Sequence, residues 1–102
     1  MVNIVIEFDS QNKDKLYRFF LKNQPDSYLW LANGDEIGFD LVESREFFYV
    51  TVARKAYLAG KENPIYIVCL PNYFLNLAKA TAVLDKFKTQ FGDDMSIDNQ
   101  SS

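Results

Sequence analysis

Apolar and polar residues alternate at the start of the chain, in the stretch MVNIVIEF. A period of two predicts a strand over residues 1–8 with one buried face and one wetter face. The buried side of this strand would carry Val2, Ile4, Ile6 and Phe8.

The next apolar residues have a helical spacing. Leu16, Phe19 and Phe20 form a stripe typical of a helix in the stretch that follows. Asp9 or Ser10 can cap the first turn by accepting a hydrogen bond from its free backbone N–H groups. Proline disfavours the helical conformation of the residue before it, so the sequence predicts a helix that ends at Gln24.

Two turn signals divide residues 28–53 into three strands. Asn33-Gly34 is typical of a two-residue hairpin turn, because both central residues of a type I′ turn need a positive φ. A second turn is expected at Glu43-Ser44. The predicted pairs are Ala32–Asp35, Trp30–Ile37 and Tyr28–Phe39 in the first hairpin, and Leu41–Glu46, Phe39–Phe48 and Ile37–Val50 in the second.

This register sorts the three strands into two faces, and a slip of one residue would mix them. The buried face would collect Tyr28, Trp30, Ile37, Phe39, Leu41, Phe48, Val50 and Val52. The opposite face would be mixed, with Gly38 opposite the ring of Tyr49, and would collect Leu29, Leu31, Glu36, Gly38, Asp40, Phe47, Tyr49, Thr51 and Ala53.

The second half of the chain predicts one buried strand and one long helix. Residues 54–64 form a basic connection of ambiguous structure, and IYIVCL has the continuous apolar character of a strand buried on both faces. Asn72 is a good N-cap for an amphipathic helix that Gly92 ends. The buried seam of this helix would be Tyr73, Leu77, Ala80, Leu84, Phe87 and Phe91.

These elements predict a two-layer α+β fold in the order β-α-β-β-β-β-α. A four- to five-stranded, mainly antiparallel sheet would carry both helices on its aromatic face, within a single domain over residues 1–92. The alternative is that the second helix covers the other face, so that Phe47 and Tyr49 belong to the core. Residues 93–102 are polar and unpatterned, which predicts a disordered tail.

Charge is concentrated in one region of this 102-residue chain. Residues 26–46 carry six carboxylates against Arg45 alone, a balance of −5 in a chain whose net charge is −3. An acidic region repels phosphate backbones, so nucleic acid is an unexpected partner. Where nucleic acid did bind, the basic residues Arg54, Lys55 and Lys61 would be the contacts.

The single cysteine, Cys69, lies in the apolar strand and cannot form an internal disulfide. No segment has the eighteen or so apolar residues that span a bilayer, and the N-terminus lacks the features of a signal peptide. We therefore expect a cytoplasmic protein with no membrane partner.

Several classes of chemistry lack their usual residues. The chain has no histidine, which removes the commonest general base and metal ligand, and no glycine-rich phosphate loop. We therefore expect no catalytic residue, no cofactor and no metal. A metal-dependent hydrolase or nuclease is a weaker alternative, and it would recruit Asp9, Asp40, Glu43 and Lys55.

We interpret the chain as a small acidic, non-enzymatic protein-binding domain. The expected function is that of an inhibitor or immunity-type protein, a bacterial or viral accessory protein that occludes a basic surface of its target. The expected anchors are Leu29, Leu31, Phe47 and Tyr49, and the expected acidic rim is Asp35, Glu36, Asp40 and Glu43. The alternative is that the same face forms a homodimer or an assembly contact.

Overall fold

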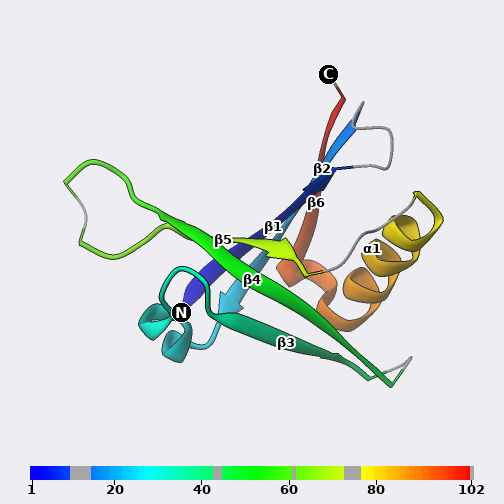
Figure 1. Ribbon diagram of the computed structural model, residues 1–102, viewed down its shortest axis with the longest axis horizontal. Helices are drawn as coiled ribbons and strands as arrows, with labels where there is room; N and C mark the ends of the chain where they lie inside the picture. Colours follow the sequence, from blue (N-terminus) through cyan, green and yellow to red (C-terminus); the bar gives the residue numbers. More distant parts are fainter. Residues whose placement is uncertain (10–14, 43–44, 61, 73–76, 102) are drawn as a thin grey trace.

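The computed structural model describes residues 1–9, 15–42, 45–60, 62–72 and 77–101. These residues form one six-stranded sheet, two short 3-10 helices and one α-helix (Figure 1). In chain order the elements are β1 (Val2–Asp9), β2 (Lys15–Gln24), η1 (Asp26–Trp30), β3 (Glu36–Leu41), β4 (Glu46–Ala56), β5 (Tyr66–Pro71), α1 (Leu77–Phe91), η2 (Gly92–Asp94) and β6 (Met95–Ser101).

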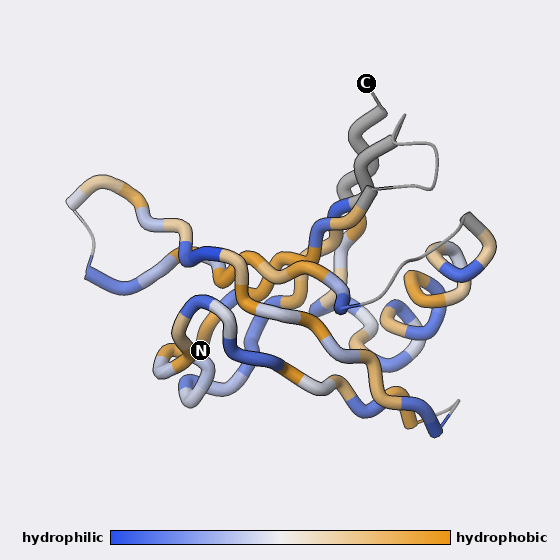
Figure 2. The backbone as a smooth tube through the Cα atoms, in the orientation of Figure 1, coloured by the Kyte–Doolittle hydropathy of each residue, from blue (hydrophilic) through white to orange (hydrophobic). Residues whose placement is uncertain are grey.

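The sheet is mixed, with the strand order β3-β4-β5-β1-β2-β6. The central strands β1 and β5 pair in parallel, and every other neighbouring pair is antiparallel. Ile67, Val68 and Cys69 of β5 are buried, as expected for a strand covered on both faces. Figure 2 shows hydrophobic stretches, in orange, along the central strands.

The helix predicted before Pro25 is wrong, because residues 15–24 form β2. β2 pairs with β1 on one side and with β6 on the other. Phe19 and Leu21 point into the core, whereas Arg18 and Phe20 belong to the other face, so this segment also has a period of two. Aromatic residues are favoured in strands, and pairing on both sides overrides the local helical spacing.

The polar segment 93–102, expected to be a disordered tail, contains the end of η2 and all of β6 instead. Met95 is buried in the core, and β6 pairs with β2 over residues 95–101. The predicted order β-α-β-β-β-β-α with two helices is therefore wrong. The described residues form six strands in one curled mixed sheet and a single α-helix.

The first predicted hairpin is also replaced, because residues 26–30 form η1 rather than a strand. Trp30 therefore does not pair with Ile37, and it is 89% exposed.

A turn is present at Asn33-Gly34, where the Asp35 N–H donates to the Ala32 carbonyl at 3.0 Å. Gly34 has a φ of 95° whereas Asn33 has no positive φ, which is the pattern of a type II turn rather than type I′.

The second hairpin has the predicted register. Ile37 pairs with Val50, Phe39 with Phe48 and Leu41 with Glu46. The side chains assigned to the buried face of these two strands are indeed buried: Ile37, Phe39, Leu41, Phe48, Val50 and Val52.

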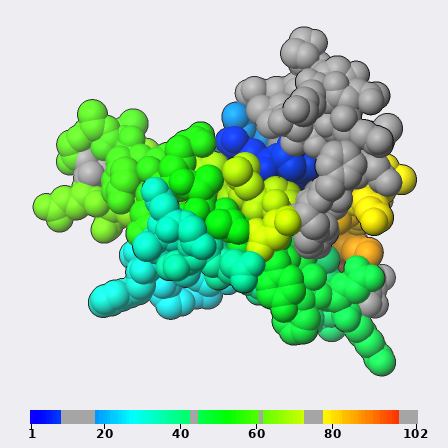
Figure 3. Space-filling view, viewed as in Figure 1, coloured from blue at the N-terminus to red at the C-terminus, as the bar shows by residue number. Residues whose placement is uncertain are grey.

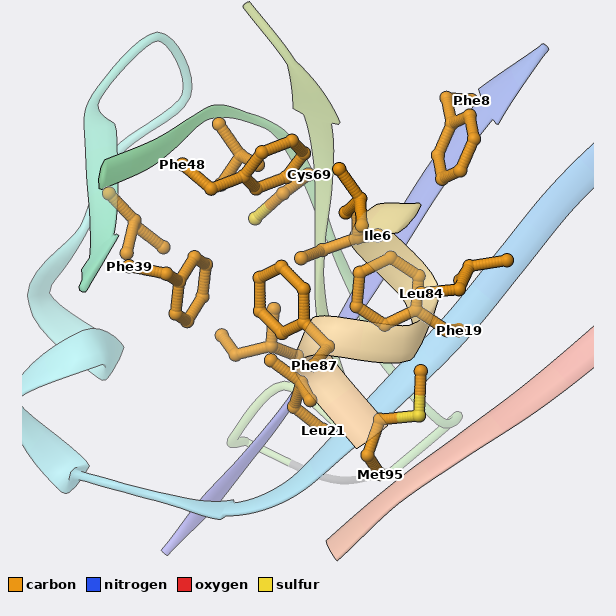
Figure 4. Packing of buried hydrophobic residues seen from close by; sticks show 14 of the residues in the cluster. Ile6, Phe8, Phe19, Leu21, Phe39, Phe48, Cys69, Leu84, Phe87 and Met95 are labelled. Atoms are coloured by element: carbon orange, nitrogen blue, oxygen red, sulfur yellow. The ribbon is translucent and has the colours of Figure 1, made fainter. Parts of the chain in front are cut away.

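The helix α1 covers this buried face, and its seam follows the predicted spacing. Phe87 is fully buried and lies among rings from three strands, with centroid distances of 5.0 Å to Phe19, 5.4 Å to Phe39 and 5.5 Å to Phe48 (Figure 4). Gly92 ends the helix with a φ of 57°, as predicted. The predicted contacts at Tyr73 and at the side chain of Leu77 lie outside the described part of the chain.

β3 is an edge strand, and Gln90 of α1 covers part of its free edge. The Gln90 Nε2 donates to the Asp40 carbonyl at 2.7 Å, and its Oε1 accepts from the Val42 N–H at 3.0 Å. One carboxamide thus satisfies a backbone donor and a backbone acceptor that another strand could otherwise pair with.

Gln90→Ala is expected to expose this edge. The loss of two hydrogen bonds is expected to destabilise the fold by about 1 kcal/mol, since both lie at the surface. Amide hydrogen exchange at Val42 is the measurement, and exchange there is expected to accelerate. Gln90→Glu is the matched control, because it keeps an acceptor for the Val42 N–H. If the Val42 amide exchanged at the same rate in Gln90→Ala as in wild type, the contact would be absent in solution.

Candidate protein-binding face

Alternation along β3 and β4 leaves one face of the hairpin pointing away from α1. Gly38 pairs with Tyr49, and Asp40 pairs with Phe47. The side chains of Glu36, Asp40, Phe47 and Tyr49 are exposed. We call the residues Glu36, Gly38, Asp40, Phe47 and Tyr49 the outer hairpin face.

Phe47 and Tyr49 form a stacked pair of rings on this face. Their centroids are 6.0 Å apart with an interplanar angle of 23°. Phe47 is 57% exposed and Tyr49 is 44% exposed, so neither ring is sealed beneath α1. The alternative that these rings belong to the core is therefore wrong.

Leu70 adds apolar surface that the sequence did not assign to this face. It lies on β5 as the cross-strand partner of Thr51, and it is 46% exposed. The continuous apolar run IYIVCL gave no sign of which residue would be open. Figure 3 shows β4 (green) and β5 (yellow-green) together over the middle of the visible surface.

Two of the four acidic residues assigned to a rim, Glu36 and Asp40, lie on the same face as the rings. Glu36 accepts a hydrogen bond from the Asn72 side chain, whose oxygen accepts one from the Thr51 hydroxyl. Asn72 therefore links β3 to β4 through its side chain.

The other predicted rim residues lie in different places. Asp40 is exposed next to Phe47, and the Asp35 carboxylate accepts a hydrogen bond from the Ala32 N–H at 2.8 Å within the turn. The predicted rim residue Glu43 lies outside the described residues.

Leu29 and Leu31 are not brought together with the rings. Leu29 lies in η1 and Leu31 directly follows it, and both are half-buried against the core. They lie apart from the outer hairpin face because residues 26–30 do not form the expected strand. Trp30 is exposed in their place, although the sequence placed it on the buried face.

Gly38→Ala is expected to displace the Tyr49 ring. A Cβ at residue 38 would lie 2.9 Å from the Tyr49 Cε1, closer than carbon atoms pack, and 3.3 Å from its Cδ1. The ring is partly exposed and can move, so we expect a change in stability below about 1 kcal/mol. Aromatic proton shifts of Tyr49 are the measurement, and unchanged shifts would contradict the contact.

The residues recruited for a metal-dependent hydrolase do not converge. Asp40 is exposed on the outer hairpin face, whereas the Lys55 Nζ donates to the Leu29 carbonyl at 2.9 Å. The side chain of Asp9 and all of Glu43 lie outside the described part of the chain. Within the described part, no three His, Cys, Asp or Glu side chains are grouped so that they could hold a metal ion.

Cys69 is fully buried, and desolvation raises the pKa of its thiol to about 12. Because the thiolate is the reactive form, the folded protein is expected to resist iodoacetamide at about pH 8, whereas the urea-unfolded chain reacts quickly. Mass spectrometry of the alkylated protein is the measurement. Equally fast labelling of the folded and unfolded chains would contradict this burial.

The same burial predicts a dependence of stability on pH. The ordinary pKa of the thiol is 9.0, so above that pH the unfolded chain releases this proton before the folded chain does. The contribution of Cys69 to the free energy of unfolding is therefore constant below pH 9.0 and falls as pH rises toward 12. Urea titrations of wild type and Cys69→Ala at a series of pH values give the dependence of the free energy of unfolding on pH. The difference between the two proteins in the slope of this dependence above pH 9.0 is the contribution of Cys69.

No α-helix among the described residues has the length and apolar content needed to cross a bilayer. No protein-family model, curated protein or solved structure matches this chain.

Proposed function

We propose that the chain is a small, non-enzymatic protein-binding domain that uses its outer hairpin face to occlude a basic surface of a protein target. The observation that carries this function is the exposed Phe47–Tyr49 stack between carboxylates. An inhibitor or immunity-type role in the cytoplasm is the form of this function that we favour. The single, unpaired cysteine suits such a compartment.

The ring pair has the character of an interface anchor. Aromatic side chains contribute much of the binding energy at protein interfaces because they bury a large area and lose little conformational entropy. Phe47 and Tyr49 pair with Asp40 and Gly38 of β3 and stack on each other, so little ordering is required on binding. Leu70 extends the apolar surface beside them.

The charges beside the rings favour a basic partner. Residues 36–42 and 46–53 contain Glu36, Asp40 and Glu46 and no lysine or arginine. Glu46 lies 3.6 Å from the Lys86 Nζ of α1, which leaves Glu36 and Asp40 beside the rings. Complementary charge at the rim of an interface accelerates encounter and disfavours acidic partners.

A homodimer through the same face is the second candidate, since exposed rings also suit self-association. A two-fold axis through the rings would bring Glu36 and Asp40 of both copies into one interface, and that repulsion opposes dimerisation. Light scattering decides between the two. A dimer that Phe47→Asp converts to a monomer would replace the binding of a basic partner as the function of this face.

The direct test begins with capture from the source cell on immobilised wild-type protein, followed by identification and purification of the captured protein. The purified protein is then titrated against wild type, Tyr49→Ala and Trp30→Ala by calorimetry. We expect a partner with a basic surface whose binding is lost in Tyr49→Ala and kept in Trp30→Ala. A partner that binds all three variants equally would contradict this function.

A further inference from the structure

A second feature of the sheet lies apart from the outer hairpin face. Residues of β1, β2, β4 and β5 line a shallow cavity of about 210 Å³ that is largely open to solvent. Val5 and Val68 line it and are only 4% and 2% exposed, so they form its floor. Arg54 at the mouth is five residues along β4 from Tyr49, a distance of about 16 Å on an extended strand.

An irregularity in β4 delivers an arginine to this cavity. The register with β5 shifts between Val52 and Arg54, so that Val52 pairs with Cys69 and Arg54 pairs with Val68. In a regular strand Arg54 would share the core face with Val52, but the extra residue turns it to the face of Val68. Lys55 then points the other way and donates to the Leu29 carbonyl.

The cavity has more positive than negative charge among its described lining side chains. Glu7 is the carboxylate, and Arg18 and Arg54 are the cations. The Arg18 Nε donates to the Glu7 Oε1 at 3.2 Å, and the Arg54 Nη2 lies 3.9 Å from the same oxygen. One carboxylate therefore faces two guanidinium groups.

Arg54 has the donor capacity to bind a further anion. Its distance of 3.9 Å from Glu7 exceeds that of a hydrogen bond, and Arg54 makes no hydrogen bond to another side chain or backbone group in the described part of the chain. A guanidinium carries five N–H donors arranged in a plane that matches a carboxylate or phosphate. Arg54 is 62% exposed, so an incoming anion can reach it.

Two aromatic rings line the same cavity. Phe20 of β2 and Tyr66 of β5 lie with their centroids 5.4 Å apart and their planes at 56°. Both rings are half-buried, and together with Val5 and Val68 they give the cavity an apolar wall and floor. A flat apolar group can pack against this wall while an attached anion reaches Arg54.

We infer that this cavity binds a small anion carrying a flat apolar group, of the class of aryl carboxylates or aryl phosphates. The volume of about 210 Å³ lies below the range of about 300–1,000 Å³ typical of sites for larger ligands, which suits one ring and one anionic group. This site uses none of the residues of the outer hairpin face and is independent of the function proposed for them.

Titration of the ¹⁵N-labelled protein with benzoate and with phenyl phosphate tests this site and separates the two anions. At least one of them is expected to produce saturable shifts at the amides of Val5, Tyr66 and Val68. Inorganic phosphate, which lacks the ring, and benzylamine, which carries the opposite charge, are expected to bind at least about tenfold more weakly. Inorganic phosphate or benzylamine binding as tightly as both aryl anions would overturn the site.

Arg54→Gln is expected to weaken binding of the aryl anion by about tenfold or more, since it removes a charged donor. Arg45→Gln is the matched control, because it makes the same change nine residues away at the end of the β3–β4 hairpin and is expected to bind like wild type. Equal binding by Arg54→Gln and wild type, or no saturable shift in wild type, would refute the site. Tyr49→Ala is expected to bind the aryl anion like wild type, which separates the test of this cavity from the test of protein binding by the outer hairpin face.

Discussion

Replacement of Phe87 by alanine is expected to lower the free energy of unfolding by about 3–5 kcal/mol. Phe87 is fully buried, and its ring contacts Phe19, Phe39 and Phe48 from three different strands. It also stacks on Phe91 at a centroid distance of 5.6 Å. The surrounding rings come from three paired strands, so little relaxation can refill the cavity that the substitution leaves.

Urea denaturation followed by circular dichroism measures this loss. Phe47→Ala is the matched control, because it removes the same atoms from a ring that is 57% exposed. We expect the control to change stability by less than about 1 kcal/mol. Similar losses in the two variants would mean that α1 does not seat Phe87 in the core. Since domains of this size are stable by about 5–15 kcal/mol, Phe87→Ala removes a large fraction of the total.

Tyr49→Ala is expected to weaken binding to the protein partner by at least about 2 kcal/mol, or about thirtyfold in affinity. The Tyr49 ring lies over Gly38 and stacks on Phe47, so it is already ordered before binding. Truncation removes the centre of the apolar surface and leaves a gap above Gly38. Calorimetric titration with the purified partner gives the affinity, and the thermal unfolding of the variant shows that the fold is kept.

Trp30→Ala is the control for this loss, since Trp30 is a larger and more exposed ring in η1, outside the outer hairpin face. It is expected to bind like wild type. Asp40→Lys is expected to slow association and to reduce its dependence on salt, because it reverses a charge beside the rings. Unchanged affinity in Tyr49→Ala, or a loss in Trp30→Ala as large as that in Tyr49→Ala, would place the interface elsewhere.

The β3–β4 hairpin could be predicted from sequence because local rules fix it. A short turn sets the register of two strands, and alternation then sorts every side chain to one face or the other. The burial of Phe39 and Phe48 and the exposure of Phe47 and Tyr49 follow directly from that register. The contact between Gly38 and Tyr49 is predictable for the same reason.

β2 could not be predicted because its residues fit two periods at once. Phe19 and Leu21 fall on one face of a strand, whereas Leu16, Phe19 and Phe20 fit a helical stripe. The choice depends on β1 and β6, which pair with β2 on its two sides. β6 is polar and lacks a pattern of its own, so its strand structure follows from long-range pairing rather than from local preference.

The anionic-ligand cavity was also beyond sequence reasoning. Arg54 and Glu7 are 47 positions apart in the chain, and they meet only because β5 lies between β4 and β1 in the sheet. Alternation alone would have placed Arg54 on the core face with Val52, and only the register shift in β4 turns it outward. No residue type near Ala53 marks that shift.

Cross-saturation NMR of the ¹⁵N-labelled protein in complex with its purified partner tests the binding role of the outer hairpin face most directly. The largest intensity losses are expected at the amides of residues 36–40 and 47–51, centred on Gly38 and Tyr49. Losses confined to α1 or η1, with the amides of β3 and β4 unaffected, would contradict the role of this face.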